Sequence, residues 1–235
     1  MNNPAKSLIL AIALLLASGQ LIAAQDFKKG VRAYNIGDYR AALEEFGALA
    51  EQGHAQAQYA LGLMNRQGIG LPQNYREAAK WFRKSADQGD NESQFHLGTM
   101  YRSGQGVARD YKEAVKWYRK SAEQGNARAQ RDLGMMYKTG VGTLSNYKEA
   151  VKWYTKSAEQ GNARAQYNLG VMYLGGLGVV QDNVHAHMWF NIAASRGSKN
   201  GAKGRDAVAK TMADSELAKA RQMARQCAGR NYRGC

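Results

Sequence analysis

The chain has 235 residues, with 33 Lys and Arg against 19 Asp and Glu, and a formal net charge of +14. A charge of this size favours anionic partners. The two cysteines and four scattered histidines lack the spacing of a metal site, and no segment after residue 24 is suited to span a membrane.

Residues 1–24 differ from the rest of the chain. Lys6 supplies a positive charge, residues 8–17 are uninterrupted apolar residues, and small residues precede Gln25. This pattern predicts a secretory signal peptide cleaved after Ala24, and therefore a periplasmic or secreted protein. The alternative is an uncut N-terminal anchor, although the apolar run is short for a transmembrane helix.

A 36-residue sequence then recurs along the chain. The copies start at Asp38, Asn74, Asp110, Asn146 and Asp182. A fixed period of this length is typical of a helical solenoid, in which neighbouring repeats bury one another's apolar faces. We predict an N-terminal helix in residues 25–37, a solenoid in residues 38–197, and a degenerate last repeat, capping helix and basic tail in residues 198–235.

Each copy has the pattern of two helices. In the third copy, Asp110 begins a capping box with Glu113 and Gly125 ends the first helix, while a second helix is predicted from about Ala127 to Thr139. Glycine inside this second helix is unfavourable by about 1 kcal/mol relative to alanine. Its recurrence therefore predicts close approach of a neighbouring helix at Gly62, Gly98, Gly134 and Gly170.

The four tryptophans share one register of the first helix, at Trp81, Trp117, Trp153 and Trp189. Because they recur at helical spacing within an apolar face, we interpret them as core residues rather than as a ligand platform. Loss of one is expected to cost ~3–5 kcal/mol.

The end of the chain departs from the repeat. A helix is expected over about residues 201–210, and Asp214 begins a last helix that caps the solenoid. Cys227 and Cys235 are predicted to form a disulfide in an oxidising compartment. Free thiols or an intermolecular disulfide are the alternatives.

The repeats resemble those of the Sel-1-like repeat (SLR) family, a relative of the tetratricopeptide repeats, through the pattern A-x-x-W-Y-x-K-S-A-x-Q-G-N-A-x-A-Q-x-x-L-G-x-M-Y-x-x-G-x-G. The resemblance implies an all-α, right-handed superhelix of antiparallel helix pairs. It also implies an adaptor or scaffold that binds other proteins along its concave side.

In tetratricopeptide-like folds the second helix lines the concave side, so the resemblance also suggests groove residues. Those two positions before the repeated Leu are Tyr59, Phe95, Arg131 and Tyr167, and those five positions after it are Arg66, Arg102, Lys138 and Leu174. An aromatic row beside a basic row suits an extended peptide with carboxylates, since aromatic residues and Arg dominate binding energy at interfaces. The alternative is that these are merely the least constrained positions of the repeat.

Basic residues also recur along the first helices, in three rows that we call the basic ridges: Arg76, Lys80 and Lys84; Lys112, Lys116 and Lys120; Lys148, Lys152 and Lys156. Ten Lys or Arg against three acidic residues follow from Arg196 to the C-terminus. We interpret the ridges as a solvated outer face. The alternative is a surface for an anionic polymer, a membrane or an acidic protein; nucleic acid is not expected for an exported protein.

Two short motifs match signatures of serine β-lactamases and penicillin-binding proteins. Ser145 and Lys148 match S-x-x-K, and residues 138–140 match K-T-G, but in reversed order and on ordinary repeat positions. We interpret the matches as coincidence. His185 and His187 face different sides of a helix and do not suit metal chelation.

The sequence thus predicts no catalytic residue, cofactor or metal, and no enzyme activity. The expected function is that of an exported, monomeric scaffold for a protein or peptide partner. A binder of anionic envelope components is the second choice, and a β-lactam-interacting hydrolase is a distant third.

Overall fold

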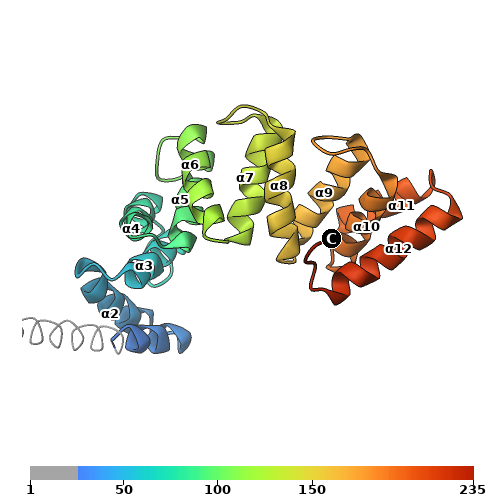
Figure 1. Cartoon of the computed structure of the whole chain (residues 1–235). Coiled ribbons are helices and arrows are strands. Elements are labelled where there is room, and N and C mark those ends of the chain that lie inside the picture. The colour runs from blue at the N-terminus through green and yellow to red at the C-terminus, as the bar shows by residue number, and fades with distance from the viewer. Residues whose placement is uncertain (1–25) are drawn as a thin grey trace, which may run out of the picture. The chain divides into compact units, whose positions relative to one another are not determined.

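The computed structural model describes residues 26–235, so the predicted signal peptide lies outside the described residues. Every regular element in residues 26–235 is a helix, and the fold is the all-α repeat solenoid that the sequence predicts. The helices are labelled and coloured along the chain in Figure 1, and the chain divides into two compact units. Unit 1 comprises residues 26–93 and 105–108, and unit 2 comprises residues 94–104 and 109–235.

Unit 1 contains a helix over residues 26–35, followed by α2 (Tyr39–Glu51), α3 (Ala55–Gln67) and α4 (Tyr75–Asp87). Helix α5 (Asn91–Ser103) begins in unit 1 and lies mostly in unit 2. The remaining helices of unit 2 are α6 (Tyr111–Glu123), α7 (Ala127–Thr139), α8 (Tyr147–Glu159), α9 (Ala163–Gly175), α10 (Asn183–Ser195), α11 (Lys199–Ala209) and α12 (Asp214–Gly229). Successive helices from α6 to α11 pack against one another, and α12 packs against α10.

Helix α6 begins and ends where the sequence predicts. Asp110 Oδ1 accepts hydrogen bonds from the backbone N–H groups of Lys112 and Glu113, at 2.9 and 3.0 Å. The backbone N–H of Asp110 donates to the carbonyl of Tyr101 at 2.9 Å and Glu113 pairs with Lys116, so the expected capping box does not form. Gly125 ends the helix with a φ of +92°, in the left-handed region.

The glycines inside the second helices accept aromatic rings from the next repeat. A Cβ on Gly170 would lie 2.5 Å from the ring of Phe190, and one on Gly134 would lie 2.9 Å from the ring of Tyr154. The predicted close approach is therefore confirmed: the nearest atoms belong to an aromatic ring, and at Gly134 the backbone oxygen of Ala150 on the neighbouring helix is also within 3.2 Å of the added Cβ. The same contact joins Gly98 to Tyr118 in unit 2 and Gly62 to Phe82 in unit 1.

The interpretation of the tryptophans as core residues is confirmed for three of the four. Trp117, Trp153 and Trp189 are 4%, 6% and 2% exposed. Trp81 is half-buried and packs against the apolar cluster of unit 1 that includes Phe46.

Pairs of glutamines, one buried and one exposed, form hydrogen bonds between repeats, and we call the series the amide ladder. Gln160 Nε2 donates to Gln130 Oε1 at 2.8 Å, and Gln130 Nε2 donates to the backbone carbonyl of Ala122 at 3.0 Å. The equivalent pairs are Gln124 with Gln94 at 2.8 Å in unit 2, and Gln88 with Gln58 at 2.7 Å in unit 1. The ladder satisfies polar groups inside the stack that would otherwise be costly to bury.

The amide ladder stops at Gln166 in unit 2. Gln166 Nε2 donates to the carbonyl of Ala158 at 3.1 Å, but its buried Oε1 has no hydrogen-bond partner among the described residues. The residue that should supply the donor is Arg196, which stands where the earlier repeats have Gln. Arg196 Nη1 donates instead to the hydroxyl of Tyr232 in the C-terminal tail, at 3.1 Å.

The C-terminal helices are close to expectation. Helix α11 begins at Lys199, before the predicted residue 201, because Ser198 accepts a hydrogen bond from the Gly201 N–H at 3.0 Å and caps the helix. Helix α12 begins at the predicted Asp214. A disulfide joins Cys227 to Cys235 and closes the tail into a loop.

Candidate functional site

The candidate groove residues fall in both units: Tyr59 and Arg66 in unit 1, and Phe95, Arg102, Arg131, Lys138 and Tyr167 in unit 2. In unit 1, Tyr59 is half-buried on α3, and its ring centre lies 6.0 Å from that of Phe82. Tyr59 lines an apolar cavity of about 440 Å³ together with Phe27 and Val31 of the first helix. Arg66 lies half-buried in the last turn of α3.

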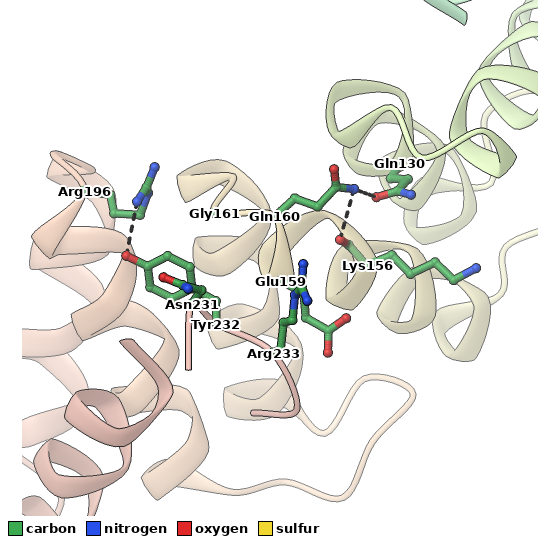
Figure 2. Close-up of a pocket in the computed structure, with 9 residues that line it drawn as sticks. All are labelled: Gln130, Lys156, Glu159, Gln160, Gly161, Arg196, Asn231, Tyr232 and Arg233. Atoms are coloured by element: carbon green, nitrogen blue, oxygen red, sulfur yellow. Dashed lines mark hydrogen bonds between the residues drawn. The ribbon is translucent and has the colours of Figure 1, made fainter. Parts of the chain in front are cut away.

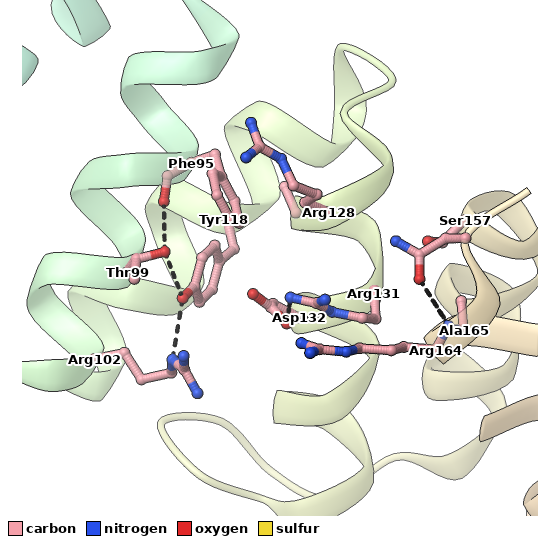
Figure 3. A network of polar contacts seen from close by, with 12 residues as sticks. Phe95, Thr99, Arg102, Tyr118, Arg128, Arg131, Asp132, Ser157, Arg164 and Ala165 are labelled. Carbon is pink, nitrogen blue, oxygen red and sulfur yellow. Dashed lines mark hydrogen bonds and ion pairs between the residues drawn. The ribbon is translucent and has the colours of Figure 1, made fainter. Parts of the chain in front are cut away.

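In unit 2, the candidates of α5 belong to a polar network (Figure 3). Tyr118 donates its hydroxyl hydrogen to Thr99 Oγ1 at 3.2 Å, and Arg102 Nε donates to the Tyr118 hydroxyl at 3.2 Å. Phe95 is only 7% exposed, because Tyr118 packs beside it and the guanidinium of Arg128 lies 4.5 Å from its ring centre. At this groove position Arg128 therefore covers the aromatic ring.

A single buried carboxylate lies among the arginines of unit 2. Asp132 is 5% exposed, and its Oδ1 accepts hydrogen bonds from Nε and Nη2 of Arg131, at 2.7 and 2.6 Å. Figure 3 shows Arg164 extending alongside Arg131 toward Asp132. Arg102, Arg128, Arg131 and Arg164 are called the arginine cluster below. Four guanidinium groups against one carboxylate leave an excess of positive charge, suited to anionic groups.

Two buried tyrosines remain neutral beside this carboxylate. Burial, and secondly the charge of Asp132, raise the pKa of Tyr118 and of Tyr154 above its ordinary value. Both phenols therefore stay protonated at neutral pH. The Tyr118 hydroxyl can donate and accept hydrogen bonds without neutralising the arginine cluster.

Tyr167 adjoins basic side chains other than those that the sequence analysis selected for the groove. Tyr167 is half-buried on α9 and lines a cavity of about 340 Å³ with Arg164, Arg196 and Lys199. Arg164 belongs to both this cavity and the arginine cluster. Lys138 is half-buried in the last turn of α7.

Sequence reasoning missed Asp132, although a signal was available. The equivalent positions of the other repeats hold Ala60, His96 and Asn168, so an acidic residue occurs there once. A lone acid on a repeat position that otherwise lacks one indicates a local role. Thr99 gave a similar signal, because the equivalent positions hold Leu63, Met135 and Val171, but its hydrogen-bond partner depends on the side chain opposite it.

The basic ridges make contacts within their own helices. The central lysine of each ridge pairs with the glutamate three residues before it: Lys80 with Glu77, Lys116 with Glu113, and Lys152 with Glu149. The last lysine of each ridge lies over the tryptophan of its own helix, at 4.1 Å for Lys84, 4.4 Å for Lys120 and 4.7 Å for Lys156. These contacts support the interpretation of the ridges as a solvated outer face.

The C-terminal tail borders a further cavity of unit 2, of about 580 Å³ (Figure 2). The Gly234 N–H donates to the carboxylate of Glu159 at 3.1 Å, and Arg196 holds Tyr232. Asn231 and Tyr232 take φ values of +50° and +66°, in the left-handed region that non-glycine residues rarely adopt. The tail is thus held by two polar contacts and the disulfide.

The motifs that suggested hydrolase chemistry take ordinary structural positions. Ser145 is exposed and donates a hydrogen bond to the carbonyl of Lys138 at 3.4 Å. The K-T-G residues end α7, with Gly140 at a φ of +72°, and do not lie on a strand. Within residues 26–235, no group of three or more His, Cys, Asp or Glu side chains is placed to hold a metal, and no helix is long and apolar enough to cross a membrane.

The Sel1 repeat profile matches residues 55–90, 91–126, 127–162 and 163–198. The chain belongs to the Sel1 repeat family. Each matched segment has the 36-residue length of the period read from the sequence. Sel1 repeat proteins generally serve as protein-interaction scaffolds. A search of the curated proteins found no match.

Solved structures agree with this assignment. The chain is similar to a Sel1 repeat protein from Oxalobacter formigenes, with 35% identity and a TM-score of 0.71 over 74% of this chain and 72% of that one. It is also similar to c5321, a protective antigen of uropathogenic Escherichia coli with an SLR fold, with 32% identity and a TM-score of 0.82. That match covers 89% of this chain but 46% of c5321, so this chain spans about half of that protein.

Proposed function

We propose that this Sel1 repeat protein is an exported scaffold that binds an acidic segment of a partner protein on unit 2, through the arginine cluster and Tyr167. The scaffold role is supported by the family, whose members generally bind proteins. The observation that carries the proposed site is the arginine cluster, in which Arg131 is paired with the one buried carboxylate, that of Asp132.

The contacts of the cluster favour binding of carboxylates. Arg131 is only 18% exposed and is held by Asp132, so little side-chain entropy remains to be lost when a partner binds. Arg128 and Arg164 are exposed at the edge of the same cluster. The guanidinium fork matches a carboxylate with two parallel hydrogen bonds, which gives orientation as well as affinity.

Export is proposed from the sequence of residues 1–24 and is supported by the disulfide between Cys227 and Cys235, since disulfides persist in oxidising compartments. N-terminal sequencing of the purified native protein should then begin at Gln25. A chain that starts at Met1 and sediments with membranes would instead support the uncut anchor.

The binding site is tested by capture of partners from cell-envelope extract on the immobilised chain that starts at Gln25. Arg128→Ala with Arg164→Ala should abolish capture of defined proteins, because both cations lie at the edge of the cluster. The matched control is Lys112→Ala with Lys148→Ala, which removes the same charge from exposed positions of the basic ridges. The control should retain capture.

The reverse result would overturn the proposed site. If the ridge variant loses capture while the cluster variant keeps it, the surface for anionic envelope components is the functional one. A second measurement at raised ionic strength separates the two further. Binding to a polyelectrolyte should weaken steeply with salt, whereas binding to a protein segment with a partly buried cluster should be only partly sensitive.

A further inference from the structure

The last three helices of unit 2 enclose a cavity of about 370 Å³ that plays no part in the proposed protein-binding site. Its polar lining comes from three elements: His187 and Asn191 on α10, Arg205 and Asp206 on α11, and Arg221 and Arg225 on α12. None of these residues belongs to the repeat pattern in its intact copies, and none lies in the arginine cluster.

The charges in this cavity are unbalanced. Arg205 is paired with its neighbour Asp206, with 2.8 Å between Arg205 Nη2 and Asp206 Oδ1. Arg221 and Arg225 are exposed, lie one turn apart on the same face of α12, and form no ion pair in the part of the chain that the structure describes. Like charges at this spacing repel each other. Three guanidinium groups against one carboxylate leave a net charge of two positive units.

A residue that lines the same cavity, His187, carries a buried polar atom without a partner in the described part of the chain. His187 is 2% exposed, and its Nδ1 has no hydrogen-bond partner among residues 26–235. Buried ring nitrogens of this kind are normally satisfied. Burial, and then the charges of Arg221 and Arg205, lower the pKa of His187, while Asp206 acts in the opposite direction. The imidazole is therefore neutral at pH 7 and does not add to the positive charge.

We propose that this cavity binds a phosphate group, with Arg221 and Arg225 as its principal ligands and the ring of His187 in its lining. A phosphate monoester carries a charge of about −1.5 to −2 at pH 7, which matches the net charge of the lining. Its oxygens accept the paired hydrogen bonds of guanidinium groups. A carboxylate would neutralise only half of this charge. The phosphate belongs to a soluble ester or to a lipid headgroup, and the test distinguishes the two.

The primary test follows the ring resonances of His187 by NMR during titration with inorganic phosphate, at constant ionic strength set with chloride. Arg221→Ala with Arg225→Ala should weaken binding roughly tenfold or more, since a hydrogen bond to a charged group is commonly worth at least that factor. The matched control is Lys203→Ala with Lys219→Ala, which removes two cations from the same two-helix region outside the cavity. The control should bind phosphate as the unmodified chain does.

The site has a second readout that a purely structural role would not change. Bound phosphate should raise the pKa of His187, because an anion beside the ring favours imidazolium. Saturable shifts that acetate or chloride do not reproduce, together with this rise, would support the site. Shifts that do not saturate, or that occur equally with acetate or in the double variant, would overturn it. Failure of this test would not affect the proposed protein-binding site, because Arg221 and Arg225 lie on α12 and the arginine cluster lies on other helices.

The source of the phosphate is resolved with two further probes. Glycerol 3-phosphate is titrated as a soluble ester, and phosphatidylcholine vesicles with and without phosphatidic acid are used in sedimentation. Binding of the ester alone assigns a soluble ligand. Sedimentation that requires phosphatidic acid and is lost in the Arg221 and Arg225 variant assigns a lipid headgroup. Binding of neither probe would overturn the proposal.

Discussion

Replacement of Arg196 by glutamine should stabilise the chain, because it extends the amide ladder by one step. Gln166 Oε1 is buried without a hydrogen-bond partner among the described residues, and the ladder pairs glutamines at this separation three times elsewhere. A buried acceptor left unsatisfied costs about 1–3 kcal/mol. The contacts that Arg196 now makes, a 3.1 Å hydrogen bond and a ring contact at 5.3 Å with Tyr232, are exposed. They contribute about 0.5–1 kcal/mol.

The comparison that isolates the ladder is Arg196→Gln against Arg196→Ala. Both variants lose the contacts between residue 196 and Tyr232, but only glutamine supplies an N–H donor to Gln166 Oε1. The glutamine variant should therefore be the more stable by about 1–3 kcal/mol. For a chain of this size, that difference raises the melting temperature by at least about 2 °C. Urea unfolding monitored by circular dichroism provides a second measure.

The existing ladder offers a control in the opposite direction. Gln160→Ala removes the donor to Gln130 Oε1 and should destabilise by about 1–3 kcal/mol. If Arg196→Gln is no more stable than Arg196→Ala while Gln160→Ala behaves as expected, water satisfies Gln166 and the reasoning about its oxygen is refuted.

Three further predictions concern packing, the tail and pH. Gly170→Ala should be destabilising, because overpacking against the ring of Phe190 costs about 1–3 kcal/mol and the gain in helix propensity is only about 1 kcal/mol. Gly47→Ala on α2 has open space around the added Cβ and should stabilise the chain by up to about 1 kcal/mol. Thermal unfolding measures both effects. Cys227→Ser with Cys235→Ser should lower the free energy of unfolding by about 2–3 kcal/mol and increase proteolysis of the C-terminal tail. Equal cleavage of the unmodified chain and the double variant would show that the disulfide does not hold the tail. Because burial and nearby arginines lower the pKa of His187 from 6.5, the unfolded chain binds the extra proton as the pH falls, so stability drops from pH 7 to 5. In urea unfolding, His187→Gln should reduce this loss of stability between pH 7 and 5. An unchanged dependence of stability on pH would contradict the lowered pKa of His187.

The periodic part of this fold was accessible from the sequence because each repeat is governed by the same local rules. Capping residues, glycine turns and an apolar register predicted helices such as α7 to the residue. The close approach at Gly134 was also predicted, but not that a tyrosine ring makes it. A glycine shows that space is needed, whereas the group that occupies the space is specified by the adjacent repeat.

The candidate site was less accessible, because its geometry depends on residues that break the period. The exposure of Phe95 is decided by Arg128, which covers its ring, and a repeat pattern does not indicate which neighbour will do so. The cavity around His187 joins three helices at the decayed end of the chain, where no period relates one residue to another. Contacts between residues this far apart in the sequence are set by how the helices pack, and the spacing of residues along the chain does not predict them.

Arg196 shows how a departure from the repeat separates stability from function. By the magnitudes above, an arginine at this position leaves a buried oxygen unpaired and gains only exposed contacts in return, so its contribution is not to stability. It does line the cavity that contains Tyr167, Arg164 and Lys199, next to the arginine cluster. If an acidic partner binds there, Arg196→Gln should bind that partner more weakly while unfolding at a higher temperature. Changes of opposite sign in the two assays would assign Arg196 to the interaction surface, whereas a loss of both would assign it to the fold.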